Sequence, residues 1–334
     1  MECILVTGGA GYIGSHTCKL LAAEGYEPVV YDNLSTGHRE FAKWGPLVEG
    51  DIRDTARLTE VLDRTRPLAV IHFAACAYVG ESVADPLKYY ANNVGGTLSL
   101  LEALRASSVR RIVFSSTCAT YGIPAVELID EETPQHPINP YGASKLIIER
   151  ILADLAARGE ISYVALRYFN AAGADSEGEI GEWHEPETHL IPLAIQSAFG
   201  GSPLQLFGTD FATPDGTAIR DYVHVEDLAR GHLQAFRYLL AGGASTAINL
   251  GTGKGSSVYQ VIQSLRDLGV SVKYTKSGRR EGDPARLVAS IGKAERVLGW
   301  TPLYEGIGKT LESAVAWFAK YGHSLRRPQV EENV

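Results

Sequence analysis

The sequence predicts an α/β protein, with a doubly wound parallel sheet and a smaller, interleaved C-terminal domain. Three observations support this fold class. Short apolar segments alternate with helical or turn segments from Met1 to about Arg167. A glycine-rich turn joins the first predicted strand to the first predicted helix. After Asn170 the alternation gives way to Gly- and Pro-rich segments, which suit a smaller lobe that closes over a substrate.

The predicted strands of the sheet are short and apolar. They lie near Ile4, Val29, Val48, Ile71, Val113 and Val164. The later run 247–250 is apolar enough to return to the sheet, so the two lobes should interleave. We therefore expect residues 1–169 to form the first domain, with returns near 222–252, and residues 170–334 to form the second.

The glycine-rich turn follows the first predicted strand. Gly8, Gly11 and Gly14 lie between the apolar segment 3–6 and the apolar-periodic run 13–21, which predicts a helix. Without side chains, these positions let the chain turn tightly and let its backbone approach a pyrophosphate at the helix N-terminus. This context is typical of a dinucleotide-binding Rossmann domain.

An acidic residue at the end of the second predicted strand indicates which dinucleotide is bound. Asp32 lies 18 residues after Gly14, about where a carboxylate accepts hydrogen bonds from an adenosine ribose. The nearest following basic residue is Arg39, so no cation directly follows Asp32 to bind a 2′-phosphate. NAD is therefore favoured over NADP.

A phenol and an ammonium group stand four residues apart at the start of a later predicted helix. Tyr141 and Lys145 belong to the segment PYGASK, and Asn139 and Pro140 suit the N-cap and the first helical position. This spacing makes the two side chains neighbours on one helical face. We expect Lys145 to favour the phenolate and to lower the pKa of Tyr141 from about 10, which makes Tyr141 a general base.

A hydroxyl-rich strand end supplies a third group. The segment 114–122 follows the strand near Val113 and contains Thr117, whose hydroxyl can bind a substrate hydroxyl. The carboxyl ends of parallel strands line the ligand crevice of such a fold, so Thr117 should lie beside Tyr141. Hydroxyl, phenol and ammonium can then converge on one alcohol over a nicotinamide ring, which is a geometry for hydride transfer.

Composition indicates the compartment. A chain of 334 residues with 45% hydrophobic residues can bury a large core. It shows no signal peptide and no apolar run near the roughly 20 residues of a membrane span, so we expect a cytoplasmic protein without a membrane anchor. The four cysteines have no metal-ligand spacing, so we expect reduced thiols and no metal site.

Net charge narrows the choice of ligand. A charge of -8 disfavours nucleic-acid binding. An anionic ligand must therefore meet a locally positive pocket, which a few arginines can provide. Arg220 and Arg280 offer planar guanidinium groups that suit a pyrophosphate. The alternative is that they form local salt bridges, Arg220 with Asp221 or Arg280 with Glu281.

Taken together, the motifs resemble the extended short-chain dehydrogenase/reductase family, and within it the UDP-hexose 4-epimerases. The resemblance covers nearly the whole chain. It rests on TGGAGYIGSH (7–16), YDNLSTGH (31–38), NPYGASK (139–145), LRYFNAAGA (166–174), DGTAIRDYVHVEDLA (215–229), NLGTG (249–253) and RREGD (279–283). It implies a Rossmann domain that binds NAD and a C-terminal domain that binds a UDP-sugar.

The resemblance also implies a reaction. It is the reversible epimerisation at C4 of a UDP-hexose, UDP-glucose or UDP-galactose, by an isomerase of carbohydrate metabolism. Tyr141 would remove the proton of the sugar 4-hydroxyl while C4 gives its hydride to tightly bound NAD. The 4-keto sugar would turn over and take the hydride back. Lys145 would hold the nicotinamide ribose, and Thr117 would orient the hydroxyl.

Further binding residues follow from the same resemblance. The implied cofactor contacts are Gly8, Gly11, Tyr12, Ile13, Gly14, Asp32, Asn33, Asp51, Ile52, Phe73, Ala74, Ala75, Asn93, Ser115, Tyr141, Lys145 and Phe169. The implied substrate contacts are Thr117, Tyr141, Asn170, His189, Leu190, Gln205, Phe207, Arg220, Tyr222, Arg280 and Asp283. A homodimer is implied as well, through the helices around 98–104 and 146–155.

Three positions depart from the family's better-known pattern. Ala77 stands where a cofactor-contacting Lys is common, which could loosen NAD. Leu287 stands where members restricted to hexoses often carry Tyr, and His189 stands where Asn is common. UDP-pentose and UDP-N-acetylhexosamine 4-epimerases therefore stay open as alternatives.

Single residues argue against two other functions. A non-catalytic NAD-binding sensor would not need an intact Tyr141 and Lys145. A dehydratase would need an acid pair after Thr117, where the chain has Cys118 and Ala119.

Overall fold

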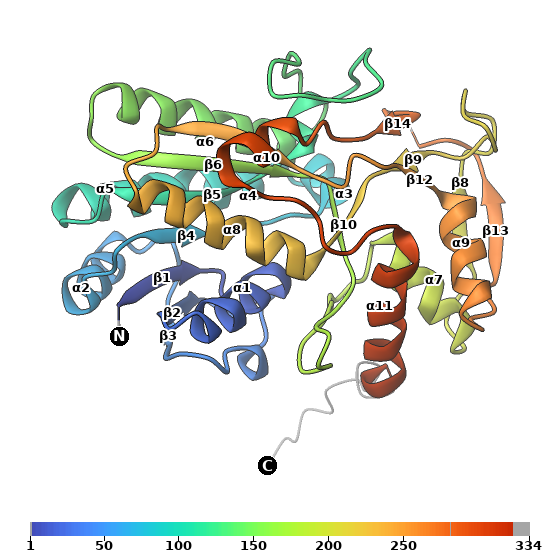
Figure 1. Cartoon of the computed structure of the whole chain (residues 1–334), viewed down its shortest axis with the longest axis horizontal. Coiled ribbons are helices and arrows are strands. Elements are labelled where there is room, and N and C mark those ends of the chain that lie inside the picture. The colour runs from blue at the N-terminus through green and yellow to red at the C-terminus, as the bar shows by residue number, and fades with distance from the viewer. Residues whose placement is uncertain (1, 281, 323–334) are drawn as a thin grey trace.

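A computed structural model describes residues 2–280 and 282–322 of the chain (Figure 1). The main sheet of this part has seven strands in the order β3-β2-β1-β4-β5-β6-β11, and all neighbouring strands run parallel. The direction of strand succession reverses between β1 and β4. This confirms the predicted doubly wound sheet, in which ligands bind at the carboxyl ends of the strands beside the reversal point.

The strands of the main sheet coincide with the predicted apolar segments. They are β1 (Cys3–Thr7), β2 (Glu27–Asp32), β3 (Leu47–Glu49), β4 (Val70–His72), β5 (Arg111–Thr117), β6 (Ser162–Tyr168) and β11 (Thr246–Leu250). The strands are apolar on both faces because helices cover both sides of the sheet. β11 forms one edge of the sheet. It pairs with β6, although the two strands are far apart in the sequence.

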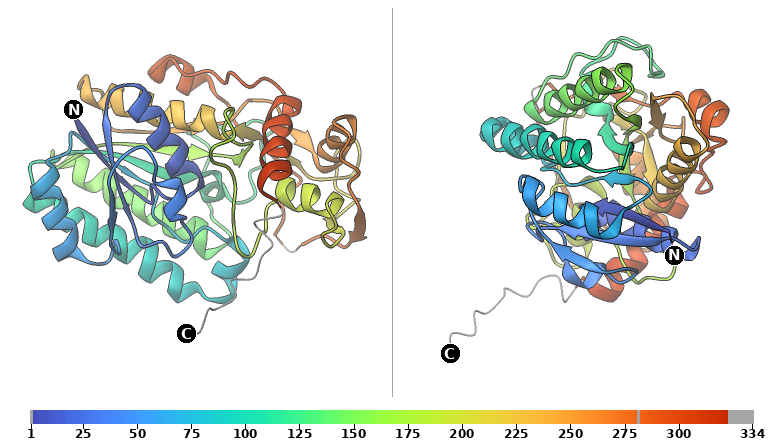
Figure 2. Two further views of the ribbon diagram at one scale, coloured as in Figure 1. Left: turned by 90° about the horizontal axis from the view of Figure 1, so that it is seen from below. Right: turned by 90° about the vertical axis from the view of Figure 1, so that its left-hand side faces the viewer.

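Helices form one layer on each side of the sheet (Figure 2). One layer contains α2 (Thr55–Thr65), α5 (Gly96–Ala106) and α6 (Pro140–Ala157). The other contains α1 (Tyr12–Ala23), α8 (Val225–Leu240) and α10 (Gly292–Leu298). Short helices connect β4 to α5, namely α3 (Val79–Ala84), α4 (Pro86–Tyr89) and the π-helical turn η2 (Tyr90–Gly95). A 3₁₀ turn, η1 (Arg39–Phe41), follows β2, and another, η3 (Cys118–Tyr121), follows β5.

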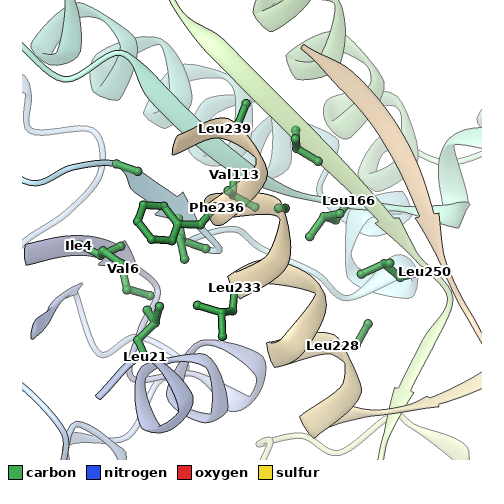
Figure 3. Close-up of a cluster of buried hydrophobic side chains, with 14 of the residues drawn as sticks. Ile4, Val6, Leu21, Val113, Leu166, Leu228, Leu233, Phe236, Leu239 and Leu250 are labelled. Atoms are coloured by element: carbon green, nitrogen blue, oxygen red, sulfur yellow. The ribbon is translucent and has the colours of Figure 1, made fainter. Parts of the chain in front are cut away.

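The layer of α1 and α8 shows how the core is built (Figure 3). Leu233 and Phe236 of α8 pack in one buried cluster with Ile4 and Val6 of β1 and with Leu21 of α1. Fully burying one such side chain is worth about 1.5–3 kcal/mol relative to leaving it exposed. Because α8 comes from the C-terminal half, this cluster ties residues 225–250 to the N-terminal sheet.

A smaller group of elements gathers at one end of the molecule (Figure 1). Its helices are α7 (Leu190–Ala198), α9 (Val258–Asp267) and α11 (Ile307–Tyr321). Its strands are β7 (Asn170–Ala172), β8 (Leu204–Phe207), β9 (Ile219–Arg220), β10 (Tyr222–His224), β12 (Ser256–Ser257), β13 (Tyr274–Ser277) and β14 (Arg286–Leu287). A separate buried cluster, with Trp317 and Phe318 of α11, holds this group together.

The strand pairs of this end place site residues side by side. β10 pairs with β7, β14 and β12 flank β9, and β13 pairs with β8. The domain division at residues 169 and 170 stays a prediction. No helix within residues 2–280 and 282–322 has the length and apolar character needed to cross a membrane.

Candidate active site

The glycine-rich turn forms a cradle between β1 and α1. Gly8 has a positive φ of 73°, and a Cβ on it would lie 2.6 Å from the backbone nitrogen of Ala74. A Cβ on Gly14 would overlap the carbonyl oxygen of Gly8. Gly11 is the N-cap of α1, whose free N–H groups and positive dipole end face the turn. The turn therefore fits a pyrophosphate held by backbone N–H groups.

Asp32 anchors the neighbouring strand end to this turn. Its carboxylate accepts hydrogen bonds from the backbone N–H of Ala10, at 3.0 Å, and of Leu34, at 2.9 Å. Burial raises the pKa of Asp32 above its usual value. Beyond it, the amide of Asn33 donates to the carboxylate of Asp51 at 3.2 Å. Acceptors for a ribose thus lie where the sequence predicts them, and the guanidinium of Arg39 is ion-paired with Glu49.

Asn93 joins the loop after β4 to helix α6. Its carbonyl accepts from the N–H of Cys76 at 2.8 Å, and its amide donates to the carbonyl of Cys76 and the hydroxyl of Ser144, both at 3.0 Å. The same loop contains Phe73, whose backbone N–H donates to the carbonyl of Thr7 at 2.9 Å. These bonds fix the strand ends that surround the predicted nicotinamide position.

Helix α6 begins where the predicted pair requires it. Asn139 is its N-cap and accepts from the N–H of Gly142 at 2.8 Å, and Pro140 is its first residue. The phenol of Tyr141 lies near the hydroxyl of Thr117, which partly opposes the rise of the pKa of Tyr141. The ammonium of Lys145 lies 6.0 Å from the ring centroid of Tyr141. The structure therefore brings all three predicted catalytic side chains to the carboxyl end of β5.

The protonation of this pair differs from the prediction. Burial raises the pKa of Tyr141 above its usual value, although the sequence predicted that Lys145 lowers it. Burial also lowers the pKa of Lys145 to about 7. The prediction was wrong because it counted the attraction between ammonium and phenolate but not the loss of solvation that both charged forms suffer in a buried site.

A buried ion pair supports Lys145 and was missed by the sequence analysis. Glu149, one turn further along α6, binds the guanidinium of Arg167 at 2.6 Å and accepts a short hydrogen bond from Ser116. Arg167 also donates to the hydroxyl of Tyr121 at 2.9 Å. The negative charge of Glu149 raises the pKa of Lys145, partly opposing burial. The spacing of 141, 145 and 149 along one helical face was the available signal.

The two arginines predicted to bind a pyrophosphate converge on one carboxylate. Arg220 lies 2.6 Å from Asp283, and Arg280 lies 3.1 Å from it. The guanidinium of Arg280 stands 4.9 Å from the ring centroid of Phe207. Asp221 instead accepts hydrogen bonds from Thr252, Gly253 and Ala289, so the local pair of Arg220 with Asp221 does not form. Glu281, the alternative partner of Arg280, lies outside the described residues.

Strand register connects this group to the catalytic residues. Tyr222 stands opposite Asn170 in the pair of β10 and β7. Leu287 stands opposite Arg220 in the pair of β14 and β9, and it packs against the buried cluster that contains Cys118 and Phe169. Cys118 directly follows Thr117, so this cluster adjoins the end of β5.

The remaining predicted substrate contacts lie elsewhere on the same end of the molecule. His189 is the N-cap of α7, and its Nδ1 is 2.6 Å from the carboxylate of Glu182. Leu190 is the first residue of α7. Gln205 is an exposed residue of β8, two positions before Phe207. The side chain of His189 is thus directed towards Glu182 rather than towards Arg220.

Comparisons with known proteins agree with this geometry. The model of the NAD dependent epimerase/dehydratase family matches residues 4–251. The UDP-glucose 4-epimerase of Rhizobium leguminosarum bv. trifolii is 55% identical over 323 residues, which are 96% of this chain and 98% of that protein. Among solved structures, the UDP-glucose 4-epimerase of Brucella ovis in complex with NAD superposes with a TM-score of 0.93 at 54% identity, covering 95% of this chain and 98% of that chain.

A more distant solved structure has a sugar nucleotide in it. The UDP-glucose-4-epimerase of Stenotrophomonas maltophila, with bound NAD and formylated UDP-arabinopyranose, superposes with a TM-score of 0.93 at 37% identity. The match covers 97% of this chain and 100% of that chain.

Proposed function

This chain belongs to the NAD dependent epimerase/dehydratase family, and we propose that within it the protein interconverts UDP-glucose and UDP-galactose by epimerisation at C4, with NAD as its cofactor. The observation that carries this proposal is the convergence of Tyr141, Thr117 and Lys145 at the carboxyl end of β5. Several relatives that match nearly the whole chain are UDP-glucose 4-epimerases.

The residues at the carboxyl ends of β1 and β2 fit NAD. The turn at Gly8 and Gly14 leaves no room for side chains where a pyrophosphate would lie, and Asp32 provides a carboxylate at the end of β2. When bound, NAD supplies the hydride acceptor and donor for C4 of the sugar. Asp51, Asn93 and Phe169 are proposed as further contacts.

The proton is handled by the chain's own residues. We assign Tyr141 as the group that takes the proton of the 4-hydroxyl and later returns it. The hydroxyl of Thr117 lies near the phenol and can orient the sugar hydroxyl. Lys145 donates to the carbonyl of Ser115 at 2.9 Å, which holds its ammonium 6.0 Å from the ring centroid of Tyr141. A nearby cation favours the phenolate that the reaction requires.

Arg220 and Arg280 are proposed to hold the diphosphate of the UDP group. Asp283 pairs with both guanidinium groups but neutralises only one of their two positive charges, and a diphosphate would replace or share that carboxylate. The negative charge of the protein as a whole then matters little, since the pocket itself is positive. Tyr222, Asn170 and Phe207 line the same region. His189, Leu190 and Gln205 stay proposed contacts.

The range of sugars follows from Leu287. Leu287 is half-buried against the cluster that contains Cys118, and it is smaller than Tyr. The sugar site therefore has room for an N-acetyl group, and a UDP-pentose would also fit. The ligand in the Stenotrophomonas structure is a UDP-pentose. UDP-pentose and UDP-N-acetylhexosamine 4-epimerases are therefore the alternatives, followed by a non-catalytic NAD-binding sensor. A homodimer and a cytoplasmic location complete the proposal.

The test uses the purified protein with UDP-galactose and no added cofactor. We expect UDP-glucose to form without accumulation of the reduced-nicotinamide absorbance, because the cofactor is regenerated in every cycle. Net reduction of NAD would instead identify an alcohol dehydrogenase. If no product forms even after NAD⁺ is supplied, the hexose proposal fails. UDP-arabinopyranose and UDP-N-acetylgalactosamine are then assayed in the same way.

A further inference from the structure

The loop between β7 and α7 brings two histidines and two glutamates together. They are Glu182, His184, Glu187 and His189, spaced by two, three and two residues. One oxygen or nitrogen atom of each lies within 4.8 Å of the corresponding atoms of the others. The proposed reaction uses none of these four groups for proton or hydride transfer.

The two carboxylates of this cluster are buried. The side chains of Glu182 and Glu187 are only 4% and 6% exposed, and that of His184 is 17% exposed. Buried carboxylates need compensating positive charge. A divalent cation with two neutral imidazoles would make the set neutral. The side chain of His189 is 49% exposed, which leaves a path for an ion to enter from solvent.

The distances from His184 to the two carboxylates match the spacing of ligands around one ion. Nδ1 of His184 is buried and makes no hydrogen bond, although it lies 3.4 Å from Glu182 and 3.6 Å from Glu187. Nδ1 of His189 lies 3.5 Å from Oε1 of Glu187, the oxygen that also accepts backbone N–H groups. Ligand atoms bonded at about 2.0–2.2 Å to one tetrahedral ion stand about 3.3–3.6 Å apart. The hydrogen bond of 2.6 Å between His189 and Glu182 is the one contact that an ion would have to replace.

Each carboxylate can offer an oxygen to the ion. One oxygen of Glu187 already accepts two backbone N–H bonds, from Thr188 and His189, at 2.8 Å each. These bonds fix the carboxylate and leave its second oxygen, Oε2, directed towards His184. Similarly, the backbone carbonyl of Glu182 accepts from the indole of Trp317 at 3.2 Å, which holds that residue in place.

We propose that Glu182, His184, Glu187 and His189 bind one divalent transition-metal ion. Two imidazole nitrogens and two carboxylate oxygens are a donor set that suits Zn²⁺, and four protein ligands fill a tetrahedral shell. The site is therefore structural, without a position for a reacting water. It does not depend on the proposed epimerase reaction.

The ion would hold the loop against the cofactor cleft. The rings of Tyr12 and Tyr78 meet the ring of His184 edge-on, at centroid distances of 6.3 and 5.8 Å. Tyr12 is the first residue of α1, directly after the glycine-rich turn. Trp183, between two of the ligands, stacks on His38 at 4.0 Å. Metal binding should therefore order residues 182–189 beside the turn that holds the cofactor.

The test measures metal binding directly. The protein is stripped with a chelator and dialysed, and Zn²⁺ binding is then followed by titration calorimetry. Co²⁺ substitution reports the coordination number through the strength of its visible absorption. We expect one equivalent per chain, a Co²⁺ spectrum of four-coordinate strength, and a melting temperature several degrees higher with Zn²⁺. Loss of a residue that only orients a metal ligand weakens metal binding by about 10–100-fold. His184→Gln and Glu187→Gln should each weaken Zn²⁺ binding by more than this.

Glu185→Gln is the matched control, because Glu185 is an exposed carboxylate of the same loop outside the cluster. It should bind Zn²⁺ as the wild type does. Failure of the wild type to bind Zn²⁺ at micromolar concentration would overturn the proposal. So would unchanged binding in both ligand variants, which would assign the ion to surface carboxylates. If the variants do not fold, the wild-type Co²⁺ spectrum decides, and the weak absorption of six-coordinate Co²⁺ contradicts the site.

Discussion

At the scale of single residues, the catalytic pair is set by burial as much as by charge. Lys145 is buried and Tyr141 is partly buried, and each loses some of the solvation that its charged form needs. Glu149 partly restores the charge of Lys145, and Thr117 partly opposes the rise of the pKa of Tyr141. The phenol of Tyr141 therefore stays protonated near neutral pH in the cofactor-free protein, and bound ligands must help to generate the phenolate.

Tyr141→Phe removes the hydroxyl that takes the substrate proton. We expect kcat to fall by about 10²-fold or more, since general-base catalysis contributes about 10²–10⁴-fold. The affinity for NAD should change little, because the ring and the rest of α6 are kept. Steady-state turnover of UDP-galactose and a fluorescence titration with NADH measure the two effects. Near wild-type turnover in this variant would exclude Tyr141 as the base.

The buried ammonium of Lys145 predicts a pH dependence of stability. Burial lowers its pKa from 10.5 to about 7. Between these values the unfolded chain holds a proton that the folded chain does not, so the free energy of unfolding rises with pH across this window. Lys145→Met lacks this proton. The wild type should therefore gain about 2–4 kcal/mol relative to Lys145→Met between about pH 7 and pH 10.

Urea unfolding of the cofactor-free proteins at several pH values in that range measures this difference. The comparison cancels every other titrating group, because both chains carry them. A difference that stays constant from neutral to alkaline pH would mean that Lys145 is an ordinary, solvated lysine in the folded protein.

At the scale of elements, helix α6 organises most of the catalytic chemistry. Its N-cap Asn139 fixes where it starts, and Tyr141, Lys145 and Glu149 follow on one face at intervals of one turn. Gly142 allows the close approach of η3, since a Cβ there would lie 2.5 Å from the carbonyl oxygen of Ala119. Helix start, cap and glycine together place the phenol beside Thr117.

The outer faces of α5 and α6 are where we expect the dimer to form. Leu98 of α5 and Ile147 of α6 are 44% and 38% exposed. A groove between the two helices is lined by Leu98, Leu101, Ile151 and Leu155. A second copy packed on this face would bury these apolar side chains.

Leu98→Asp puts a charge into that face and should convert dimers to monomers, as measured by light scattering after gel filtration. Leu303→Asp is the control, because Leu303 is 59% exposed and lies outside these helices. A dimer that survives Leu98→Asp would place the interface elsewhere.

At the scale of the whole molecule, the sequence predicted best those local structures that only a few residue types can form. The glycines at 8, 11 and 14, the carboxylate at 32 and the cap at 139 each predicted a local structure that is present. The parallel sheet followed from apolar runs of strand length. β11 could be predicted as a strand of this sheet because the run 247–250 is about as apolar as the earlier strands.

The rest depended on contacts between distant segments. The sharing of Asp283 by Arg220 and Arg280 follows from how β9 and β14 pair, which no local pattern reveals. The pKa of Tyr141 follows from burial by several elements at once. The cluster at residues 182–189 was missed for a different reason, because only the cysteines were considered as metal ligands. Its spacing of Glu, His, Glu and His was visible in the sequence.

The central claim is that C4 of the sugar gives up a hydride and receives the same hydrogen back. UDP-galactose with deuterium at C4 is incubated with the protein in ordinary water, and the product is analysed by mass spectrometry and NMR. We expect UDP-glucose with the deuterium still at C4, because a hydride held on the bound cofactor does not exchange with solvent. UDP-glucose with protium at C4 would show that the hydrogen leaves as a proton, and would contradict this mechanism.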